Sequence, residues 1–471
     1  MRIKIWFLLI IAFNCSFIVH PQTVDKLSNE QRTWLLKAIR HKKNGWIYLH
    51  IEGTPKERGF QHGFLLANEI NDALHVMKSV WEYQTATKWS WAVARAGEMF
   101  TSKIDPENIT EIDGIVEGMK THNFSTTRDE IVAYNGWKEL LWYWWPTVKD
   151  TISPNTPVPI QESCSAFIAT GNMTTDGKIV LGHNTWDDYC IPVYNIIIDI
   201  SPSSGNKILM QSAAGHIHSG TDFFITSAGI IGAETTIGGF FPFNPDGAPE
   251  FSRVRRAMQD AHSIEEWCEI MKKGNSGAYA NSWLIGDINT NEIARLELGL
   301  KYVGFEKKSN GYFSGSNIAD DLNILRKETT INETDIRNSN IARKVRWEQL
   351  MKEYTGKIDV EKGKEMLSDH YDTFLGVLKP DSRTICGHVE LDDQTYGILE
   401  PFRPIGAYDG KVVNSVMAKN MTFEARWGSS CGMPFDAKKF LSDHPQFSWM
   451  KGLIKDRPTQ PWTVFNSGET K

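Results

Sequence analysis

The sequence predicts an α+β protein in which layers of helix pack against an antiparallel β-sheet. Residues 26–41 and 65–145 carry apolar residues at helical spacing, and no proline interrupts these stretches before Pro106. The middle of the chain, residues 165–298, consists largely of short apolar runs separated by tight turns, which is typical of an antiparallel sheet. Helical runs on both sides of a strand-rich middle indicate sheet and helix layers packed together.

The first residues have the features of a secretion signal. Arg2 and Lys4 precede an apolar run over residues 5–19, which is shorter than the roughly 20 residues that span a bilayer. We expect a signal peptide over residues 1–22, with an uncleaved anchor as the alternative. Five sequons in the remaining chain agree with secretion, and their asparagines are predicted glycosylation sites: Asn108, Asn123, Asn172, Asn332 and Asn420.

Composition indicates an ordinary globular protein. Of the 471 residues, 41% are hydrophobic, and the net charge of −6 comes without a basic stripe, which argues against nucleic acid as a partner. With the signal, this predicts a secreted or lysosomal protein, or a periplasmic one in a bacterial host. The tryptophans of the helical part indicate either a wide helix core or an apolar groove for an acyl chain: Trp81, Trp89, Trp91, Trp137, Trp142, Trp144 and Trp145.

A proline-rich linker divides the chain. Residues 46–52 alternate like a strand, and residues 57–63 open the long helical stretch. Residues 146–163 then hold four prolines among Ser, Thr and Asn, and this linker ends at Cys164. We expect an N-terminal helical part, residues 23–163, and a strand-rich part, residues 164–471.

Hairpin patterns follow Cys164. Asp176 and Gly177 form a strong turn signal between two apolar runs, and Asn289 lies in another turn of this kind. A cysteine that begins the first strand after a loop is expected at a sheet edge, open to a cleft. The predicted strands are 165–170, 179–183, 193–200, 207–212, 223–231, 283–287 and 293–298, and the predicted helices are 253–271, 340–354 and 359–369.

The cysteine count points to a free thiol. The chain has six cysteines, and Cys15 is expected to leave with the signal peptide, so that five remain. An odd cysteine in an oxidising compartment is either a reactive free thiol or an intermolecular link. Two disulfides among the others are possible, with a pairing that spacing does not define. No CxxC pair occurs, so the sequence predicts neither a zinc ribbon nor a metal or cofactor site.

Several blocks in order resemble the phospholipase B-like family, and an early block is similar to the related acyl-coenzyme A:6-aminopenicillanate acyltransferase-type family. The blocks are SCSAF at 163–167, GHNTW at 182–186, ETTIG at 234–238, NSGAYANSW at 275–283, KVVNSVMAK at 411–419 and the early GTPKERGFQHG at 53–63. The resemblance covers roughly residues 42–450. It implies an N-terminal-nucleophile hydrolase of four-layer αββα architecture that matures by cutting itself between Ser163 and Cys164.

The chemistry of Cys164 agrees with that implication. A thiol is a good nucleophile only as thiolate, so a base must sit beside it. Cleavage before Cys164 would free an α-amine, whose pKa of about 7.7–8.0 lets it act as that base near neutral pH. One residue then supplies both nucleophile and base. The alternative reading of Cys164 is a buried core cysteine in an apolar strand.

Supporting roles follow from matching segments. Arg253 lies in a Ser-Arg segment similar to that of related amidases, including bile-salt hydrolases, which implies a role in holding the thiolate and the oxyanion. A surface arginine is the alternative, with Arg255 and Arg256 as rivals. Asn281 is expected to donate its amide to the oxyanion, with a plain turn asparagine as the alternative.

Four further residues are expected to bind substrate: His183, Asn184, Trp186 and Thr235. Bile-salt hydrolases and acid ceramidase carry Gly-Arg-Asn-x-Asp where this chain has His183 and Trp186 in place of the arginine and the aspartate. Thr235 lies where related enzymes place an oxyanion asparagine. These departures favour the phospholipase B-like branch. They argue against carrying over the substrate preference of bile-salt hydrolases and acid ceramidase.

Two competing signals are weak. Residues 428–432 match the G-x-S-x-G nucleophile motif around Ser430, with Asp436 and His444 after it, but Pro434 follows almost at once, where the motif needs a helix. The pair His216 and His218, like His183 with the following aspartates, is expected to be solvated or core rather than metal-binding.

Two functions therefore stay open. The first is an acyl hydrolase that acts on lipid esters or N-acyl amides and needs no cofactor, with its two fragments held together after self-cleavage. The second is a catalytically idle scaffold of the same fold that binds lipid or a partner protein. An intact Cys164 within its matching blocks favours the enzyme.

Overall fold

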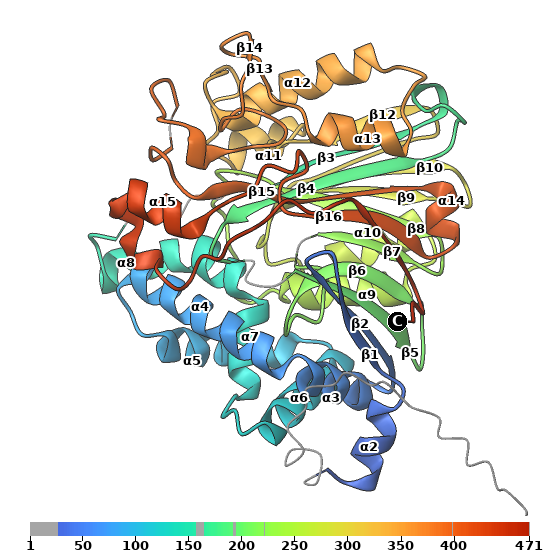
Figure 1. Cartoon of the computed structure of the whole chain (residues 1–471), viewed down its shortest axis with the longest axis vertical. Helices are drawn as coiled ribbons and strands as arrows, with labels where there is room; N and C mark the ends of the chain where they lie inside the picture. Colours follow the sequence, from blue (N-terminus) through green and yellow to red (C-terminus); the bar gives the residue numbers. More distant parts are fainter. Residues whose placement is uncertain (1–26, 157–163, 192–194, 221, 398, 471) are drawn as a thin grey trace, which may run out of the picture.

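The computed structural model describes residues 27–156, 164–191, 195–220, 222–397 and 399–470 (Figure 1). The expected signal peptide over residues 1–22 lies outside the described residues, and so does Ser163, on the N-terminal side of the expected cleavage bond. Within the described ranges, no helix is long and apolar enough to cross a membrane.

The N-terminal part forms a layer of helices at the bottom of Figure 1. Ser28 and Thr54 each close a capping box at a helix start, with Gln31 and Glu57 as the reciprocal partners. The elements are α2 (Asn29–Leu35), α3 (Pro55–Leu65), α4 (Ala67–Thr85), α5 (Trp89–Phe100), η1 (Thr101–Lys103), α6 (Pro106–Thr121), α7 (Arg128–Asn135), the π-helix η2 (Glu139–Trp144) and α8 (Trp145–Ile152).

The prediction of one helix over residues 26–41 is wrong after Leu35. The chain leaves α2 and forms β1 (Ile39–Lys43), which pairs with β2 (Trp46–Gly53) as a hairpin. Asn44 and Gly45 connect the strands with φ of 47° and 84°, the conformation that Asn-Gly favours in two-residue hairpin turns. Pairing with β2 outweighed the helical periodicity of this short segment.

The block at 53–63 that carried part of the resemblance packs two helices together. Gly59 and Gly63 on α3 face Gly114 and Gly118 on α6, and a Cβ built at Gly63 would lie 2.0 Å from the Ile115 carbonyl oxygen. Only glycine lets the two backbones approach this closely. The glycines of this block therefore explain helix packing rather than a binding site.

Two sheets lie above this helix layer. One has nine strands in the order β1-β2-β5-β6-β7-β8-β9-β10-β11, and the other has six in the order β12-β3-β4-β15-β16-β17. All neighbouring pairs are antiparallel except β2 and β5. The later strands are β3 (Ser165–Thr170), β4 (Val180–Asp188), β5 (Asn195–Pro202), β6 (Ile208–Ala213), β7 (Phe223–Thr226), β8 (Ile230–Thr236), β9 (Asn281–Asp287), β10 (Glu292–Leu298), β11 (Val303–Lys308), β12 (Gly311–Gly315), β15 (Ile405–Asn414), β16 (Thr422–Trp427) and β17 (Thr463–Asn466), with a separate hairpin of β13 (Tyr371–Asp372) and β14 (Val377–Leu378).

Three apolar clusters separate four layers. On β5, Ile196 and Ile198 pack toward the N-terminal helices, whereas Ile197 packs between the two sheets, as the two-residue period of a strand requires. On β3, Ile168 also points between the sheets, whereas Phe167 packs under the helices at the top of Figure 1. The layers run helix, sheet, sheet, helix, which confirms the predicted four-layer αββα architecture.

The remaining helices cover both outer faces. The predicted helix over residues 253–271 is divided in two, because the chain turns at Ala261 and Ser263 caps a new helix. The predictions over 340–354 and 359–369 are confirmed by α12 and α13. These helices are α9 (Glu250–Asp260), α10 (Ile264–Lys272), α11 (Leu322–Lys327), α12 (Ser339–Glu353), α13 (Val360–Leu367), α14 (Ser415–Lys419) and α15 (Ala437–Asp443), with the short turns η3 (Gly171–Met173), η4 (Val389–Leu391) and η5 (Pro445–Met450).

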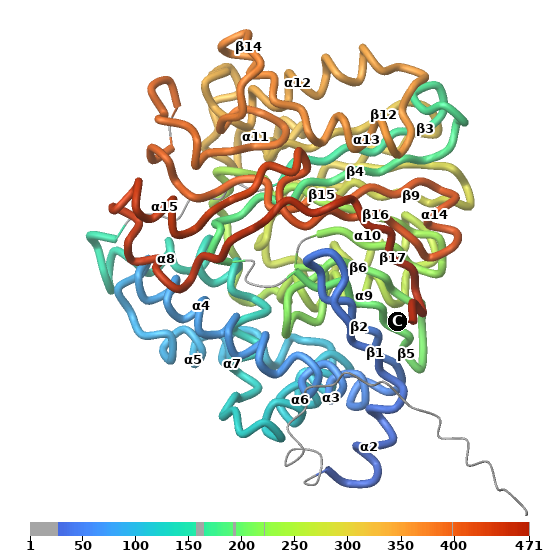
Figure 2. Tube along the Cα trace, in the orientation of Figure 1, coloured from blue at the N-terminus to red at the C-terminus, as the bar shows by residue number. Residues whose placement is uncertain are grey.

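The C-terminal end of the described chain lies beside strands from its beginning, as the red and blue ends of the tube show in Figure 2. The Ser467 hydroxyl donates to Asp199 on β5 at 2.8 Å, and Lys43 on β1 forms an ion pair of 2.6 Å with Glu469. The last described residues therefore contact strands β1 and β5 of the nine-stranded sheet.

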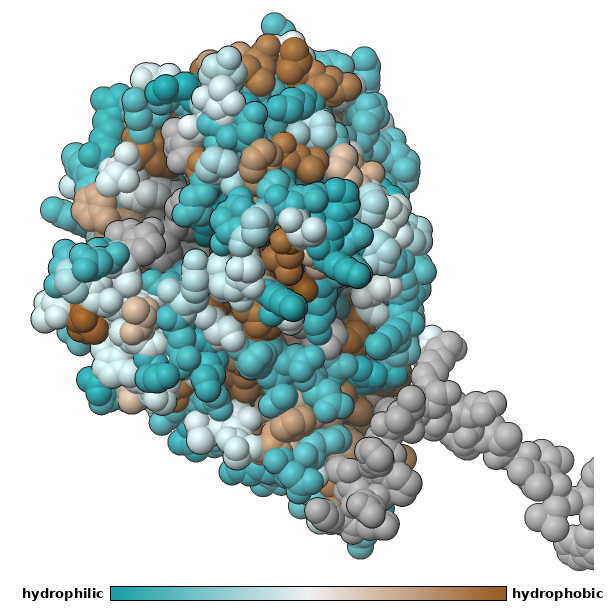
Figure 3. Space-filling view, turned by 60° about the vertical axis from the view of Figure 1, so that its left-hand side comes forward, coloured by the Kyte–Doolittle hydropathy of each residue, from teal (hydrophilic) through white to brown (hydrophobic). Residues whose placement is uncertain are grey.

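The tryptophan-rich stretches form core. Trp81 and Trp145 are fully buried with ring centroids 6.0 Å apart, and Trp91 packs against Trp144 at 5.1 Å. Of the two readings, the wide helix core describes these rings. On the face shown in Figure 3, apolar residues form small groups separated by hydrophilic ones.

The sequons differ in exposure. Asn108 is only 2% exposed, and its side-chain nitrogen donates to the Ser252 hydroxyl at 3.0 Å. The structure argues against a glycan there, because a sugar on a buried, hydrogen-bonded amide has no space. The other four asparagines are exposed: Asn123, Asn172, Asn332 and Asn420.

Candidate active site

Cys164 lies immediately before β3, which is an interior strand of the six-stranded sheet between β12 and β4. Its side chain is fully buried, and its φ of 74° is in the left-handed region that residues with a side chain rarely adopt. Such a conformation costs about 1–3 kcal/mol and persists only where the surroundings hold it. The backbone is thus bent at the residue that follows the expected cleavage bond.

Two carboxyl groups lie beside the thiol. The Sγ atom of Cys164 and one carboxylate oxygen each of Asp222 and Glu234 all lie within 4.8 Å of one another. Burial raises the pKa of the thiol well above its ordinary range, the neighbouring carboxyl groups of Glu234 and Asp222 add to this, and Lys138 and the Trp186 N–H oppose it only in part. In the uncut chain the thiol is therefore protonated.

A buried lysine supplies the positive charge. The Lys138 Nζ atom lies 3.9 Å from Asp222 and donates to the Tyr279 hydroxyl at 3.1 Å. Burial alone would lower the pKa of Lys138, but Asp222 and Asp187 raise it above its ordinary value, so the side chain stays an ammonium.

Tyr279 connects these groups. Its hydroxyl donates to Glu234 at 2.6 Å and accepts from Thr236 at 2.8 Å. Burial and Asp222 raise the pKa of Glu234 well above its ordinary value, so Glu234 is a neutral acid. The thiol, the two carboxyl groups, the lysine and the tyrosine form one buried polar network between the layers.

Asn281, expected at the oxyanion, lies in this network. With its amide oriented to satisfy its neighbours, the side-chain nitrogen donates to Glu234 at 2.8 Å and to the Ala280 carbonyl at 2.9 Å. Asn281 begins β9 and pairs with Thr236 at the end of β8, which brings it to the same end of the sheet as Glu234. Its printed contacts reach the acid beside the thiol.

The four expected substrate-binding residues fall on different faces. On β4, His183 points between the sheets and its Nε2 donates to the Glu234 carbonyl at 3.0 Å. Asn184 and Trp186 point to the opposite face, where they donate to the Leu367 and Ile385 carbonyls at 2.8 and 3.3 Å. Strand alternation thus separates His183 from the other two, which hold the upper helix layer.

His183 on β4 of the six-stranded sheet and Thr235 on β8 of the nine-stranded sheet are both buried. Burial, with Lys411, lowers the pKa of His183 well below its ordinary value, so its ring is neutral. The Thr235 hydroxyl has no hydrogen-bond partner among the described residues, and a Cβ built at Gly315 would lie 2.4 Å from it. Thr235 packs against β12.

Two arginines have different roles. Arg343 on α12 is fully buried and donates to the Cys164 carbonyl at 2.5 Å and to the Ser165 hydroxyl at 2.9 Å. It also lies over the Trp186 ring at 4.3 Å. Arg253, the expected oxyanion arginine, donates instead to three carbonyls, those of Ala248, Met271 and Ala278.

The arginine that contacts the cysteine is therefore Arg343, whereas Arg253 supports the backbone before Tyr279. Arg255, one of the alternatives to Arg253, forms an ion pair of 3.1 Å with Glu111 in the helix layer. Sequence reasoning missed Arg343 because α12 lies far along the chain from Cys164. It also missed Lys138, for which a lysine inside the aromatic run ending at Trp145 was a usable signal.

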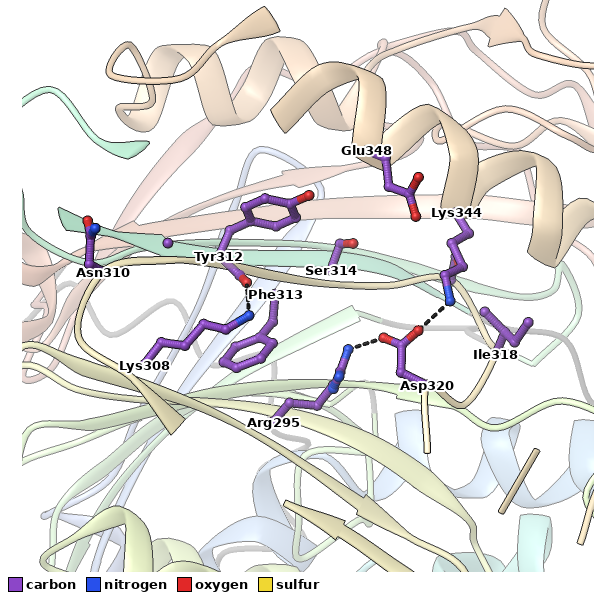
Figure 4. Close-up of a pocket in the computed structure, with 12 residues that line it drawn as sticks. Arg295, Lys308, Asn310, Tyr312, Phe313, Ser314, Ile318, Asp320, Lys344 and Glu348 are labelled. Carbon is purple, nitrogen blue, oxygen red and sulfur yellow. Dashed lines mark hydrogen bonds and ion pairs between the residues drawn. The ribbon is translucent and has the colours of Figure 1, made fainter. Parts of the chain in front are cut away.

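A pocket of about 320 Å³ lies along β12, next to the strand that Cys164 begins (Figure 4). Arg295, Asp320 and Lys344 pair across its floor, and Cys164 does not line it. The pocket has charged residues beside the apolar side chains of Tyr312, Phe313 and Ile318.

The competing G-x-S-x-G motif has no catalytic context. Ser430 is buried and donates to the Asn184 side-chain oxygen. His444 stacks on Phe402 at 4.6 Å, and Asp436 caps α15. The strand before Ser430 is followed by turns, and no helix begins until Ala437.

The chain thus has a four-layer αββα fold with a buried cysteine at the start of an inner strand, as the resemblance implies for N-terminal-nucleophile hydrolases. The family described as Phospholipase B matches residues 103–326, which include Lys138, Cys164, Glu234 and Tyr279. Over this segment, just under half of the chain, the chain is similar to the phospholipase B-like proteins, in agreement with the resemblance of its blocks.

Individual relatives match over shorter segments. Phospholipase B-like protein C of Dictyostelium discoideum is 32% identical over 179 residues, which cover 35% of this chain and 30% of that protein. Putative phospholipase B-like 2 of Homo sapiens is 33% identical over 142 residues, covering 26% and 24%. The matches therefore span a third or less of these relatives. An uncharacterized protein of Archaeoglobus fulgidus matches more widely, at 22% identity over 69% of this chain and 58% of its own.

Two solved structures are similar over much of their length. A mutant conjugated bile acid hydrolase from Clostridium perfringens has a TM-score of 0.37 at 11% identity, covering 64% of this chain and 97% of its own. Penicillin V acylase from Agrobacterium tumefaciens has a TM-score of 0.29 at 10% identity, covering 56% and 83%.

Proposed function

We propose that this chain is a self-processing cysteine hydrolase of acyl ester or amide bonds. The observation that carries the proposal is the buried thiol of Cys164 on a left-handed backbone, with Glu234 and Asp222 beside it and Lys138 close by. A core cysteine needs none of these neighbours, because a buried thiol behaves as a small apolar group. Buried charge costs free energy, and its concentration around a nucleophile is typical of active sites.

Self-cleavage begins with transfer of the Ser163 acyl group from the Cys164 nitrogen to the Cys164 sulfur. The Cys164 thiol attacks the carbonyl carbon of Ser163, and the peptide C–N bond breaks, so that the Ser163 acyl group becomes a thioester and the Cys164 nitrogen leaves as an amine. The thiol proton passes to that nitrogen. Water then hydrolyses the thioester and yields the Ser163 carboxylate and the free thiol.

In the mature site the new α-amine of Cys164 is the base that takes the thiol proton. Lys138, through its charge, stabilises the oxyanion of the tetrahedral intermediate, and Asn281 is proposed to exchange its hydrogen bond to the Ala280 carbonyl for one to the oxyanion. Arg343 holds the backbone of Cys164 in place through its carbonyl. Arg253 is proposed as a structural residue that supports the backbone before Tyr279 through the Ala278 carbonyl.

The two fragments remain associated after the cut. Parallel pairing of β2 with β5 joins residues on both sides of the cleavage bond in one sheet. Lys138 also comes from the N-terminal part and Cys164 from the C-terminal part, so the site exists only while the parts stay together.

Lipid esters are the proposed substrates, because relatives carry the name phospholipase B-like. N-acyl amides are the second class, since esters and amides pass through the same thioester. Four exposed sequons agree with a secreted or lysosomal glycoprotein. His183 and Thr235 would then border the site, whereas Asn184 and Trp186 would support it from the opposite face of β4.

The test is to trap the acyl-enzyme. The purified protein is incubated with a panel of phospholipids, lysophospholipids and N-acyl amides and quenched in acid. The expected result is an acyl mass added to the peptide that begins at Cys164, with turnover lost in Cys164→Ala and kept in Cys268→Ala, another buried cysteine. Turnover that survives Cys164→Ala would contradict the proposal, and a chain that cuts itself but hydrolyses no member of the panel would favour the lipid- or protein-binding scaffold.

A further inference from the structure

A second group of cysteines and histidines lies at the other side of the six-stranded sheet. One ligand atom each from His370, Cys386, His388 and Cys431 lies within 4.8 Å of the other three. The four residues come from the segment after α13 and from the turn after β16. They lie near the beginning of β15, where His388 pairs with Gly406. The network around Cys164 shares none of these residues.

The distances in this group fit a tetrahedral metal site. The Nε2 atom of His388 lies 3.6 Å from Cys386 Sγ and 3.4 Å from Cys431 Sγ. Zinc binds sulfur at about 2.3 Å and nitrogen at about 2.0–2.1 Å, so tetrahedral geometry separates a sulfur from a nitrogen ligand by about 3.6 Å. These two distances are close to those that one bound ion would set between His388 and each sulfur.

The surroundings of the two rings support the same conclusion. The Nδ1 atom of His388 pairs with the Glu390 carboxylate at 2.9 Å, which leaves Nε2 facing the sulfurs. A carboxylate behind the ring is the usual partner of a metal-binding histidine, because it fixes the ring and its tautomer. The Nε2 atom of His370 is buried and has no hydrogen-bond partner among the described residues.

We propose that His370, Cys386, His388 and Cys431 bind one zinc ion in a closed, structural S₂N₂ site. Two thiolates and two imidazoles are a donor set that zinc selects, and four protein ligands leave no open position for catalysis. Binding replaces the two thiol protons, which pass to solvent. This site was not expected from the sequence, which has no CxxC pair and predicted no metal.

The zinc ion ties two loops to the sheet beneath Trp186. Cys386 and Cys431 pack against the cluster around Trp186, and Ser430, next to Cys431, donates to Asn184. The Asn184 nitrogen in turn holds the Leu367 carbonyl at the end of α13. Zinc would therefore fix the upper helix layer on the strand that pairs with β3.

A disulfide between Cys386 and Cys431 is the competing arrangement. It would use both sulfurs and would give no reason for two imidazoles and a carboxylate to converge on them. The two arrangements differ in metal content and in the mass of the peptides, so one preparation distinguishes them.

The experiment uses the full-length protein, purified without a histidine tag or chelator. Elemental analysis is expected to give one zinc per chain, and exchange with Co²⁺ to give thiolate charge-transfer and tetrahedral d–d bands. Cys431→Ser should lose the metal and the bands, whereas Cys268→Ser should keep both. Glu390→Gln keeps all four ligands and should weaken zinc affinity about 10–100-fold.

Two results would overturn the proposal. One is a wild-type protein that contains no zinc and gives no tetrahedral Co²⁺ spectrum after mild reduction. The other is a peptide map in which Cys386 and Cys431 are joined as a disulfide. Both readouts use the wild type, so they hold even if a variant fails to fold, and neither depends on hydrolysis at Cys164.

Discussion

The two cysteine-containing groups of this protein lie on the same six-stranded sheet and have opposite surroundings. Around Cys164, burial and the neighbouring Glu234 and Asp222 keep a single thiol protonated, and Lys138 opposes them in part. Around Cys386 and Cys431 the neighbours are imidazoles aimed at two sulfurs. The residue type is the same in both places, and the different neighbours are the basis for proposing a nucleophile in one place and a metal ligand in the other.

The largest expected effect separates the two groups directly. Cys164→Ala should abolish self-cleavage and lower kcat/KM by about 10⁴-fold or more, because it removes the nucleophile. Its zinc content should remain at one per chain. Steady-state kinetics and elemental analysis of the same sample check this, and activity close to wild type would break the comparison.

The second prediction concerns the charge at the nucleophile. Lys138→Gln should slow self-cleavage roughly 100-fold, because the ammonium lowers the pKa of the thiol and faces the developing oxyanion. Lys138→Arg keeps the charge and should lose less, and exposed Lys88→Gln serves as the control. Rates come from the time course of fragment appearance. Equal rates for the Gln and Arg variants would show that the charge is irrelevant.

The third prediction distinguishes the two arginines. Arg343→Lys loses the fork that holds the Cys164 carbonyl and the Ser165 hydroxyl, so self-cleavage should slow by about 10-fold. Arg253→Lys should instead lower the melting temperature and leave the cleavage rate per folded molecule unchanged, because its partners are backbone carbonyls. If the two variants exchange these behaviours, Arg253 is the residue that serves the oxyanion.

The smallest effect is a pH dependence of stability. Burial and Asp222 raise the pKa of Glu234 well above its ordinary value of 4.5, so the folded chain keeps a proton that the unfolded chain releases. Its contribution to stability is full below about pH 4.5 and is lost as the pH rises through the folded pKa. Glu234→Gln stays neutral and should decline less steeply.

Thermal unfolding from about pH 4 to about pH 8 measures this slope. Exposed Glu98→Gln should follow the wild type across the range. A Glu234→Gln variant with the wild-type slope would show that this carboxyl titrates normally, and the thiol would then lose one of the neighbours that keep it protonated.

Local patterns predicted most of the fold. An apolar run before the Asp176–Gly177 turn predicted β3, alternation predicted β2, and the helices α12 and α13 were also predicted. The partner strand β1 was missed, because it is short and its Asn44–Gly45 turn was the signal that outweighed periodicity. The division into α9 and α10 depended on the capping Ser263.

The site was predicted only in part. Matching blocks located Cys164 and Asn281, which the structure brings to one network with Glu234. Lys138 was overlooked although it stands inside an aromatic run, and Arg343 could not be located, because its distance along the chain from Cys164 carries no pattern. For the same reason Cys386 and Cys431, 45 positions apart (431 minus 386), matched no spacing rule for zinc ligands.

The central claim is that Cys164 cuts the bond before it, and the intact mass of the purified protein under denaturing conditions tests this most directly. The account predicts two fragments that meet between Ser163 and Cys164 and elute together in native buffer, with Cys164→Ala remaining full length. A Cys164→Ala chain cut at the same bond would show that another protease does the work. A wild-type chain that stays whole would show that Cys164 never becomes an N-terminal nucleophile.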